Sequence, residues 1–367
     1  MNEILLFMVL FSALLIWRLG FFQSWWQRQR RKKDWGRVTL IIGAGEKAFD
    51  IYREFEQSIE HDFRCIGFIE TEKEKCAEQI PEHLILGTYS DRLKILGEQK
   101  VECVIVSTQL LSNKERIELV EECLQKAITV EETGDSFQIV RDNWELDEYA
   151  GVQTVRFRGA RYDPQINISK RVLDIIGAGL GLVILSLLLL VIALLIKFTS
   201  KGPVIYRQKR IGKDGKEFIF YKFRSMRIEG EERDGSLRQN QYLESMEAGK
   251  PMGKIVNKNR ITTVGRFLRD TSLDELPQFW SVVKGDMSLV GPRPCLPYEY
   301  ELYQDWHRKR FAVLPGCTGI WQVSERLKVS FEDMILLDFF YLENMSVLFD
   351  MKILIKTIPQ MLLSKSG

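Results

Sequence analysis

The sequence contains little of what a metal-centred or disulfide-bonded fold requires. It has only three histidines, and its six cysteines are dispersed without zinc-type spacing, at Cys65, Cys76, Cys103, Cys123, Cys295 and Cys317. Internal repeats and low-complexity tracts are absent as well. These features predict reduced, mostly buried thiols in a cytosolic domain. A participating metal is then expected to be a hard cation held by carboxylates and phosphate.

The sequence also lacks an excess of charge of either sign, with 52 Lys and Arg against 50 Asp and Glu and a net charge of +2. Its charge is concentrated locally. The densest basic run, residues 28–33, follows an apolar stretch over residues 4–17 and a group of aromatic residues. Such a basic run is typical of the cytoplasmic side, and the start, Asn2-Glu3, does not fit a signal peptide. We predict an uncleaved membrane anchor over residues 1–27, with its C-terminal end in the cytoplasm.

Residues 36–150 alternate short apolar strands with amphipathic helices, which predicts a Rossmann-like parallel α/β domain. The expected strands are at residues 38–42, 65–69 and 103–107, and one expected helix is at residues 114–126. Gly43 and Gly45 form a G-x-G-x-x-A turn after the first strand, where backbone N–H groups approach a phosphate. Glu70 is then placed to meet a ribose hydroxyl. Gly43 and Gly45 are therefore candidate cofactor-binding residues, and a tight turn without any nucleotide remains the alternative.

Residues 175–196 contain no charge, and a straight helix of this length crosses the roughly 30 Å hydrocarbon core of a bilayer. Basic residues flank the segment on both sides, at Lys170, Arg171, Lys197 and Lys201. Basic flanks at both ends favour a re-entrant helix that returns to the face it entered. Ser186 lies at the middle, where a hydroxyl bonded to a backbone carbonyl bends a helix. An ordinary transmembrane helix is the alternative that hydropathy alone supports.

Two adjacent carboxylates, Asp274 and Glu275, follow at the start of an expected helix over residues 273–284. Ser272 and Glu275 have the spacing of a capping box, Gly285 fits the end of the helix, and Pro277 is expected to kink it. Anions are stabilised at a helix N-terminus, so Asp274 is expected to be ionised as a nucleophile or a metal ligand. The simpler interpretation is that Glu275 only caps a helix.

Basic side chains surround this segment in the sequence. Arg266 and Arg269 precede it, and Arg293 lies between two prolines that limit its backbone for bidentate phosphate contact. Further basic groups, interleaved with aromatic ones, occur at residues 206–212 and 221–226. This composition also occurs in nucleic-acid sites. Its position just after the apolar segment instead favours binding of a phospholipid-like substrate and a nucleotide diphosphate.

From Ser169 to about Leu362, the chain resembles the bacterial polyprenyl-phosphate sugar-1-phosphate transferases, also called initiating glycosyltransferases. The resemblance rests on ordered motifs: Lys170-Arg171-x-x-Asp174, residues 199–204, Gln208-x-Arg210-Ile-Gly, residues 221–226, residues 272–278, residues 285–294, and Pro315-Gly-x-Thr318-Gly-x-x-Gln322-Val. It implies a mainly helical, membrane-embedded catalytic domain over residues 168–367, with residues 175–196 as a re-entrant helix. The whole chain is then an anchor, a Rossmann-like domain and this catalytic domain.

The resemblance also implies a reaction. A sugar 1-phosphate passes from a UDP-sugar to undecaprenyl phosphate, UMP is released, and a phosphosugar-enzyme intermediate forms on the way. Asp274 is implied as the nucleophile and first ligand of Mg²⁺, and Glu275 as its catalytic and metal-binding neighbour. The implied phosphate- and substrate-binding residues are Arg269, Arg293, Lys222, Arg210, Arg224 and Gln322.

The implied setting is the bacterial inner membrane, with the catalytic domain facing the cytoplasm at the first step of exopolysaccharide, capsule or O-antigen synthesis. Expected partners are membrane lipid and downstream glycosyltransferases, with a second copy of the chain as a candidate and no nucleic acid. Glucose, galactose and N-acetylated amino sugars all remain candidate sugars. The chain departs from the family at Leu187, where a proline commonly follows the serine, at Ser281, and at residues 324–326.

Two other functions fit parts of the sequence. One is a membrane-anchored nucleotide-sugar oxidoreductase or dehydratase that uses the turn at residues 43–48. Such enzymes usually need a Tyr-x-x-x-Lys pair, which the sequence lacks. The other is a non-catalytic scaffold that binds a nucleotide, against which the Asp274-Glu275 pair and its arginines argue.

Overall fold

The computed structural model describes residues 36–57, 63–71, 76–108, 110–133, 147–149, 152–157, 159–227, 239–240, 242–243, 260–323 and 331–363. The expected anchor and the departure at residues 324–326 lie outside this part. The chain divides into two compact units, Met1–Ser112 with Leu119–Arg156, and Asn113–Glu118 with Phe157–Gly367. The three-part division expected from the sequence stays a prediction, because its first part lies outside the described residues.

The first unit is built on a sheet with strand order β3-β2-β1-β4-β5-β7-β6. Its strands are β1 (Arg37–Ile42), β2 (Phe63–Glu70), β3 (Ile85–Thr88), β4 (Cys103–Val106), β5 (Thr129–Thr133), β6 (Asp147–Tyr149) and β7 (Val152–Phe157). The neighbours from β3 to β5 pair in parallel, whereas β6 and β7 are antiparallel. The order 3-2-1-4-5 is that of doubly wound α/β folds. The expected parallel α/β sheet is therefore confirmed.

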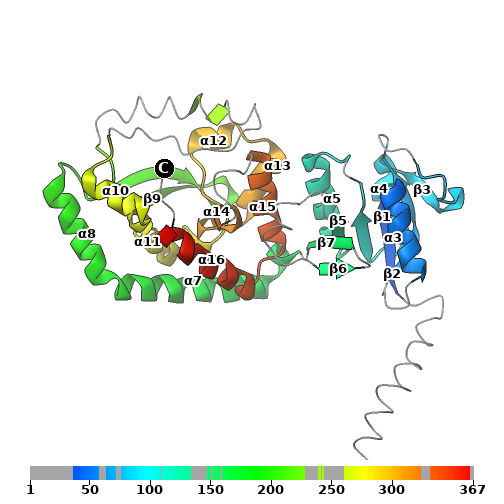
Figure 1. Cartoon of the computed structure of the whole chain (residues 1–367), viewed down its shortest axis with the longest axis horizontal. Helices are drawn as coiled ribbons and strands as arrows, with labels where there is room; N and C mark the ends of the chain where they lie inside the picture. The colour runs from blue at the N-terminus through cyan, green and yellow to red at the C-terminus, as the bar shows by residue number, and fades with distance from the viewer. Residues whose placement is uncertain are drawn as a thin grey trace, which may run out of the picture. The chain divides into compact units, whose positions relative to one another are not determined.

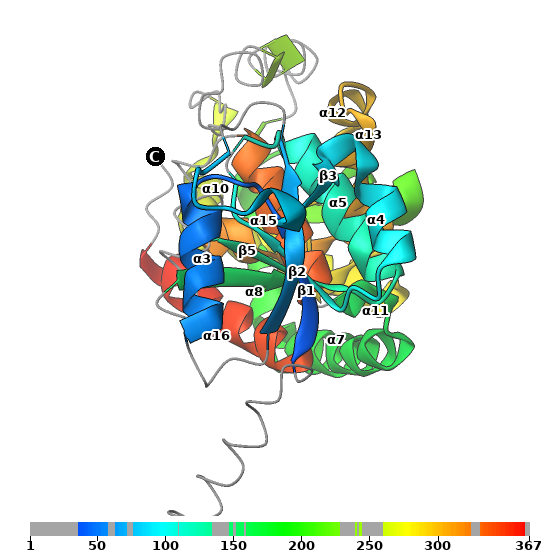
Figure 2. The ribbon, with the colours of Figure 1, turned by 90° about the vertical axis from the view of Figure 1, so that its right-hand side faces the viewer.

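Helices cover both faces of this sheet, as Figure 2 shows. Helix α3 (Glu46–Gln57) lies on one face, and α4 (Arg92–Glu98) and α5 (Asn113–Gln125) lie on the other. The side chains of the central strands β1 and β4 are therefore inaccessible to water on both faces, and all of Leu40–Ile42 and Cys103–Val106 are buried. This burial explains why these strands read as unbroken apolar runs in the sequence rather than as alternating ones.

The second unit begins with two helices that meet at a bend (Figure 1). Helix α7 (Pro164–Ile184) starts where the Asp163 side chain accepts a hydrogen bond from the Gln165 N–H, and its first residue is proline. Helix α8 (Ser186–Thr199) follows after Leu185, and the two are bent by 61°. No described helix alone is long and apolar enough to cross a membrane, and only this bent pair passes as a combination. The break thus falls beside Ser186, where the sequence predicts it.

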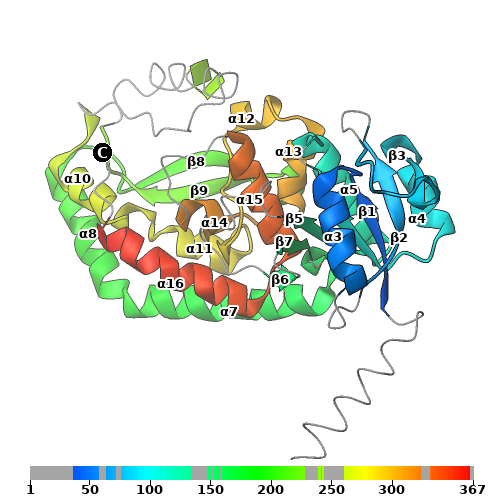
Figure 3. The same ribbon diagram turned by 45° about the vertical axis from the view of Figure 1, so that its right-hand side comes forward.

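A compact body packs on this helix pair. It contains the antiparallel hairpin β8 (Ile205–Ile211) and β9 (Glu217–Phe223), the parallel pair β10 (Ser288–Val290) and β11 (Gly316–Thr318), and the helices α10 (Thr263–Asp270), α11 (Gln278–Lys284), α12 (Pro297–Glu301), α13 (Asp305–Arg308), α14 (Ile320–Val323), α15 (Phe331–Glu343) and α16 (Val347–Leu363). Helix α16 runs alongside α7 (Figure 3). It buries Asp350 and Ile353 against the body and leaves Leu348 and Ile355 exposed.

Two glycines allow α7 to approach the body closely. A Cβ at Gly181 would lie 2.8 Å from Cε2 of Phe279 in α11, and one at Gly177 would lie 2.7 Å from Cδ1 of Leu289 in β10. Gly179, between them on another face of the helix, has open space around its Cβ position. The glycines therefore serve packing at two positions, in addition to any effect on the bend.

This contrast predicts opposite effects of two matched substitutions. Gly179→Ala should raise the unfolding temperature slightly, since alanine is favoured over glycine in a helix by up to about 1 kcal/mol. Gly181→Ala should lower it despite the same gain, because overpacking against Phe279 costs roughly 1–3 kcal/mol. Thermal unfolding of the detergent-solubilised variants measures the difference. Equal shifts in the two variants would contradict the packing described here.

Candidate active site

The two adjacent carboxylates lie on a turn between α10 and α11. The Thr271 hydroxyl donates to the Phe267 carbonyl at the end of α10, and Ser272 then adopts a left-handed conformation with φ 55°. Residues Leu273–Glu275 form one turn of 3₁₀ helix, and the Glu275 N–H donates to the Ser272 carbonyl at 3.2 Å. A serine in this conformation costs of order 1 kcal/mol, which is typical of functional sites.

This geometry corrects two expectations. The Ser272 side chain makes no capping hydrogen bond, so the expected capping box is wrong. The α-helix begins at Gln278 rather than at residue 273, and Leu273–Glu275 form a separate turn of 3₁₀ helix before it. Pro277 therefore stands just before α11, where its missing N–H costs nothing, and does not kink a helix. The expected end of the helix is confirmed, since Gly285 caps α11 with φ 101°.

The turn places the two carboxylates differently. Asp274 is buried, with 6% of its surface exposed. Glu275 is partly exposed, and its Oε1 lies 2.6 Å from Nζ of Lys222 on β9. Burial and then the negative charges of Glu275 and Asp174 raise the pKa of the Cys317 thiol on β11. The structure thus brings Lys222 and both predicted catalytic residues together.

Three other predicted residues are partly exposed. The Nη1 atom of Arg269 lies 3.6 Å from Sδ of Met226, and the guanidinium of Arg293 lies 5.9 Å from the centre of the Trp321 ring. Gln322 follows Trp321 on α14. Their accessibility suits contact with a substrate, and their role as phosphate- or substrate-binding residues stays a prediction.

Arg210 and Arg224 have a different environment, because both are buried. Arg210 donates to the Gln208 side chain through Nε and Nη2 and to the Pro294 carbonyl through Nη1. Arg224 donates through Nη2 to the hydroxyl and the carbonyl of Ser200, at the end of α8. In this structure both guanidinium groups hold main-chain segments in place.

The candidate cofactor residues Gly43 and Gly45 belong to the first unit. The Gly43 N–H donates to the Ile69 carbonyl at 2.9 Å, and the carbonyl of Ala44 accepts from the Ala77 N–H at 2.8 Å. The main chain of this turn is thus engaged with its neighbours at two points. Nucleotide binding here stays a prediction.

Among the described residues, no group of three or more His, Cys, Asp or Glu side chains is placed to hold a metal. Mg²⁺, however, typically keeps several waters and binds one or two carboxylates together with substrate phosphates. The adjacent oxygen donors of Asp274 and Glu275 fit such a partial ligand set.

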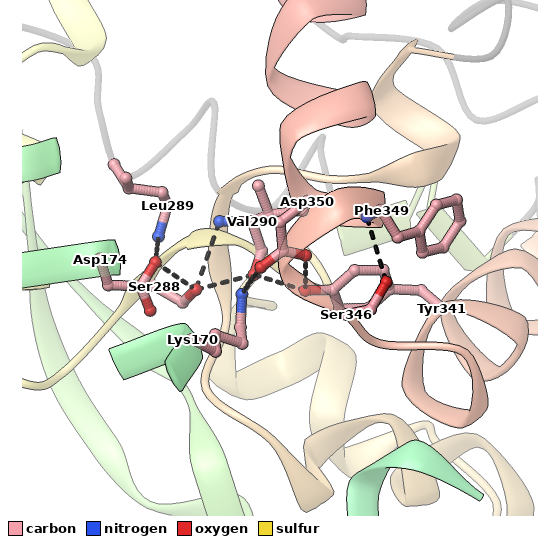
Figure 4. A network of polar contacts seen from close by, with 9 residues as sticks. All are labelled: Lys170, Asp174, Ser288, Leu289, Val290, Tyr341, Ser346, Phe349 and Asp350. Carbon is pink, nitrogen blue, oxygen red and sulfur yellow. Dashed lines mark hydrogen bonds and ion pairs between the residues drawn. The ribbon is translucent and has the colours of Figure 1, made fainter. Parts of the chain in front are cut away.

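A buried polar network joins α7, β10, α15 and α16 (Figure 4). Nζ of Lys170 on α7 lies 2.5 Å from Oδ2 of Asp350 on α16 and donates to the Val290 carbonyl at 2.8 Å. The Tyr341 hydroxyl oxygen on α15 lies 3.0 Å from the same carbonyl oxygen and 2.8 Å from Oδ1 of Asp350, and it can donate to either. Burial raises the pKa of Asp350, and the charge of Lys170 opposes this shift.

The other members of the Lys170-Arg171-x-x-Asp174 motif hold the neighbouring elements. Asp174 accepts from the Ser288 hydroxyl and the Leu289 N–H of β10. Arg171 donates to the carbonyls of Val282 and Val283 in the last turn of α11. Sequence reasoning treated the two basic residues as membrane flanks and missed these contacts. The signal was the i, i+4 spacing of Lys170 and Asp174, which puts opposite charges on one helix face.

Comparison with known proteins agrees with this geometry. Residues 165–364 match the family described as bacterial sugar transferase, and these residues contain the whole site described above. The chain belongs to the bacterial sugar transferase family. The expected family and the expected class of enzyme, a transferase, are confirmed. Residues 4–131 match a second family, described as a CoA-binding domain.

Three relatives illustrate the similarity. Galactosyl transferase CpsE of Streptococcus agalactiae is 38% identical over 59% of this chain and 47% of its own length. UDP-galactose-lipid carrier transferase of Erwinia amylovora is 31% identical over 89% of this chain and 69% of its own. UDP-glucose:undecaprenyl-phosphate glucose-1-phosphate transferase of Escherichia coli is 33% identical over 73% and 56%. The chain thus spans about half the length of the first and third of these relatives.

The buried network predicts a large stability difference between two lysines. Lys170→Met leaves Asp350 buried without its cation, and breaking a buried pair in this way costs about 3–5 kcal/mol. Lys284→Met removes a pair with Asp286 in which the lysine is about half exposed, which is worth about 1 kcal/mol or less. Chemical unfolding in detergent compares the two variants. A Lys170→Met protein as stable as Lys284→Met would contradict the structural role of the network.

Proposed function

We propose that the protein transfers a sugar 1-phosphate from a UDP-sugar to undecaprenyl phosphate, with release of UMP. The observation that carries this proposal is the buried Asp274 beside the Lys222–Glu275 pair, in a family of sugar transferases. The names of two relatives mention UDP-galactose, UDP-glucose and a lipid carrier, so these two donors are the first to test. Neither name describes an oxidoreductase or a scaffold protein.

We further propose a two-step reaction. An Asp274 oxygen attacks the phosphorus next to the sugar, the bond from that phosphorus to the bridging oxygen breaks, and UMP leaves with the electron pair. An oxygen of undecaprenyl phosphate then attacks the same phosphorus, and the Asp274 carboxylate is regenerated. Covalent catalysis thus divides one difficult transfer into two easier ones. Lys222 holds Glu275 beside the nucleophile, and Arg269 and Arg293 offset the charge of the phosphates.

Asp274 and Glu275 are the residues that would hold Mg²⁺. When bound, the ion would reduce the negative charge of the diphosphate, so that a carboxylate can approach it. Lys222 would keep Glu275 oriented toward this position.

We also propose that α7 and α8 form a re-entrant membrane segment at the cytoplasmic face of the inner membrane. Large apolar side chains on both helices are exposed, including Ile184 at 74%, Leu187 at 72% and Phe198 at 83%. Both ends of the pair bond to the same body, the start through Lys170 and Arg171 and the end through Arg224. A segment that is tied to one body at both ends returns to the side from which it entered. This also explains how Leu187, in place of proline, is compatible with a bend.

The nucleophile assignment predicts the effect of Asp274→Asn. UMP release with UDP-galactose or UDP-glucose, undecaprenyl phosphate and Mg²⁺ should fall by about three orders of magnitude or more. Without acceptor, the unaltered protein should gain a sugar phosphate on Asp274 by mass spectrometry, and the variant should not. Asp286→Asn, which changes the surface pair with Lys284, serves as control and should keep full turnover. Full turnover of Asp274→Asn would rule out this nucleophile.

The re-entrant segment predicts that both ends of the helix pair face the same compartment. Gln165→Cys and Lys201→Cys place thiols at exposed positions near the two ends. A membrane-impermeant maleimide should label both in inside-out vesicles and neither in spheroplasts, with the unaltered chain as background. Labelling of the Lys201→Cys protein from outside would show instead that the segment spans the membrane.

A further inference from the structure

The turn at residues 291–294 is fixed through its main chain. The Gly291 N–H donates to the Thr318 carbonyl at 2.9 Å, and the Pro292 carbonyl accepts from the Gly316 N–H at 2.8 Å. A Cβ at Gly291 would lie 2.6 Å from the Leu314 carbonyl oxygen. The two segments therefore touch backbone to backbone, which leaves no space for a side chain at this position.

The next carbonyl, that of Arg293, is held by a buried ion pair. Nη2 of Arg310 donates to it at 3.0 Å and lies 2.5 Å from Oδ2 of Asp338 on α15. Nη1 of Arg310 is 3.3 Å from the Tyr303 hydroxyl. Arg310 is 2% exposed and Asp338 is 1% exposed. This guanidinium is enclosed by protein and is directed at the main chain of Arg293.

The carbonyl of the next residue, Pro294, accepts a hydrogen bond from the Arg210 side chain. Its Nη1 donates to this oxygen at 3.1 Å, while Nε and Nη2 both donate to Oε1 of Gln208. The guanidinium also lies 5.3 Å from the centre of the Phe220 ring. Every nitrogen of the Arg210 guanidinium thus has an acceptor within the protein. A phosphate would have to compete with these acceptors at a buried position.

Arg293 differs from both of these arginines, because its side chain is partly exposed beside Trp321. Burial, and then the positive charge of Arg293, lower the pKa of Arg210 to about 10. The two cations therefore lie close enough to repel each other. The fixed turn keeps the positive side chain of Arg293 at the surface. An oxyanion bound there would relieve the repulsion between Arg293 and Arg210.

We propose that Arg210 and Arg310 are positioning residues, which bind the carbonyls of Pro294 and Arg293 and so hold the Arg293 guanidinium ready for a substrate phosphate. This assigns Arg210 a role through the turn, in place of the direct phosphate contact that the resemblance implies. The identity of the anion rests on the proposed function. Preorganisation of this kind lowers the cost of orienting a charged group when substrate binds.

A double-mutant cycle separates positioning from direct contact. With UDP-galactose or UDP-glucose as donor, Arg210→Lys should reduce kcat/KM for UMP release by about tenfold or more. In an Arg293→Ala protein the same change should cost less than about threefold, because residues that act as one unit are not additive. Arg310→Lys, which keeps a cation opposite Asp338, should behave in the same way. If Arg210→Lys reduced kcat/KM by the same factor in the unaltered protein and in the Arg293→Ala protein, Arg210 would contact the substrate itself.

Hydrogen exchange of the substrate-free protein provides a readout that does not depend on activity. Exchange in a peptide covering residues 287–296 should rise in Arg210→Met and Arg310→Lys and stay unchanged in Arg293→Ala. Arg308→Met is the matched control, since its exposed guanidinium pairs with Asp305 at the surface two positions before Arg310. Unchanged exchange in both Arg210→Met and Arg310→Lys would overturn the proposal. If the unaltered protein releases no UMP, the proposed function fails while this measurement still decides the role of the two arginines.

Discussion

Nζ of Lys170 and the hydroxyl oxygens of Ser288 and Tyr341 all lie within hydrogen-bonding distance of the main-chain carbonyl oxygen of Val290. Lys170 and Tyr341 come from α7 and α15, and both also contact Asp350 of α16, so that three helices are joined around one strand. Removing any member leaves a buried polar group without its partner, which makes such a network highly specific for one arrangement. Strand β10 is therefore rigidly placed, and the turn that carries Arg293 starts from it.

The same network determines how the apolar helices are attached. Lys170 and Arg171 belong to an amphipathic start of α7 whose polar face is turned inward, toward β10 and α11. Arg224 completes the attachment at the far end of α8. Between these points most of the exposed side chains are apolar, and Ser186, Lys197 and Thr199 are the exposed polar ones. The helix pair thus has an inner face specified by polar contacts near its ends and a largely apolar outer face, as the proposed membrane segment requires.

Regular parts of the structure were predictable, because their signal lies in neighbouring residues. The buried strands β1, β2 and β4 read as apolar runs bounded by polar segments, and Gly285 marks a helix end. The turn at Ser272 was not predictable in this way, since its spacing matches a capping box and only tertiary contacts select the left-handed conformation. The pair Arg310–Asp338 is separated by 28 positions and has no periodic signal. Arginines with different roles also look alike in sequence, and only burial and bonding partners distinguish Arg210 from Arg293.

The choice of bonding partners has an electrostatic consequence. Arg171, Arg210 and Arg224 donate to neutral acceptors, which are main-chain carbonyls, a serine hydroxyl and a glutamine side chain. A neutral acceptor fixes the orientation of a guanidinium without cancelling its charge, whereas a carboxylate does both. The hydrogen-bond acceptors of these three guanidinium groups therefore fix their orientation without offsetting their charge, and for Arg210 the negative charge of Glu299 offsets it in part. In the proposed reaction, such a field would attract an anionic donor and lower the repulsion between its diphosphate and the attacking carboxylate, so that these arginines would assist the chemistry without touching the substrate.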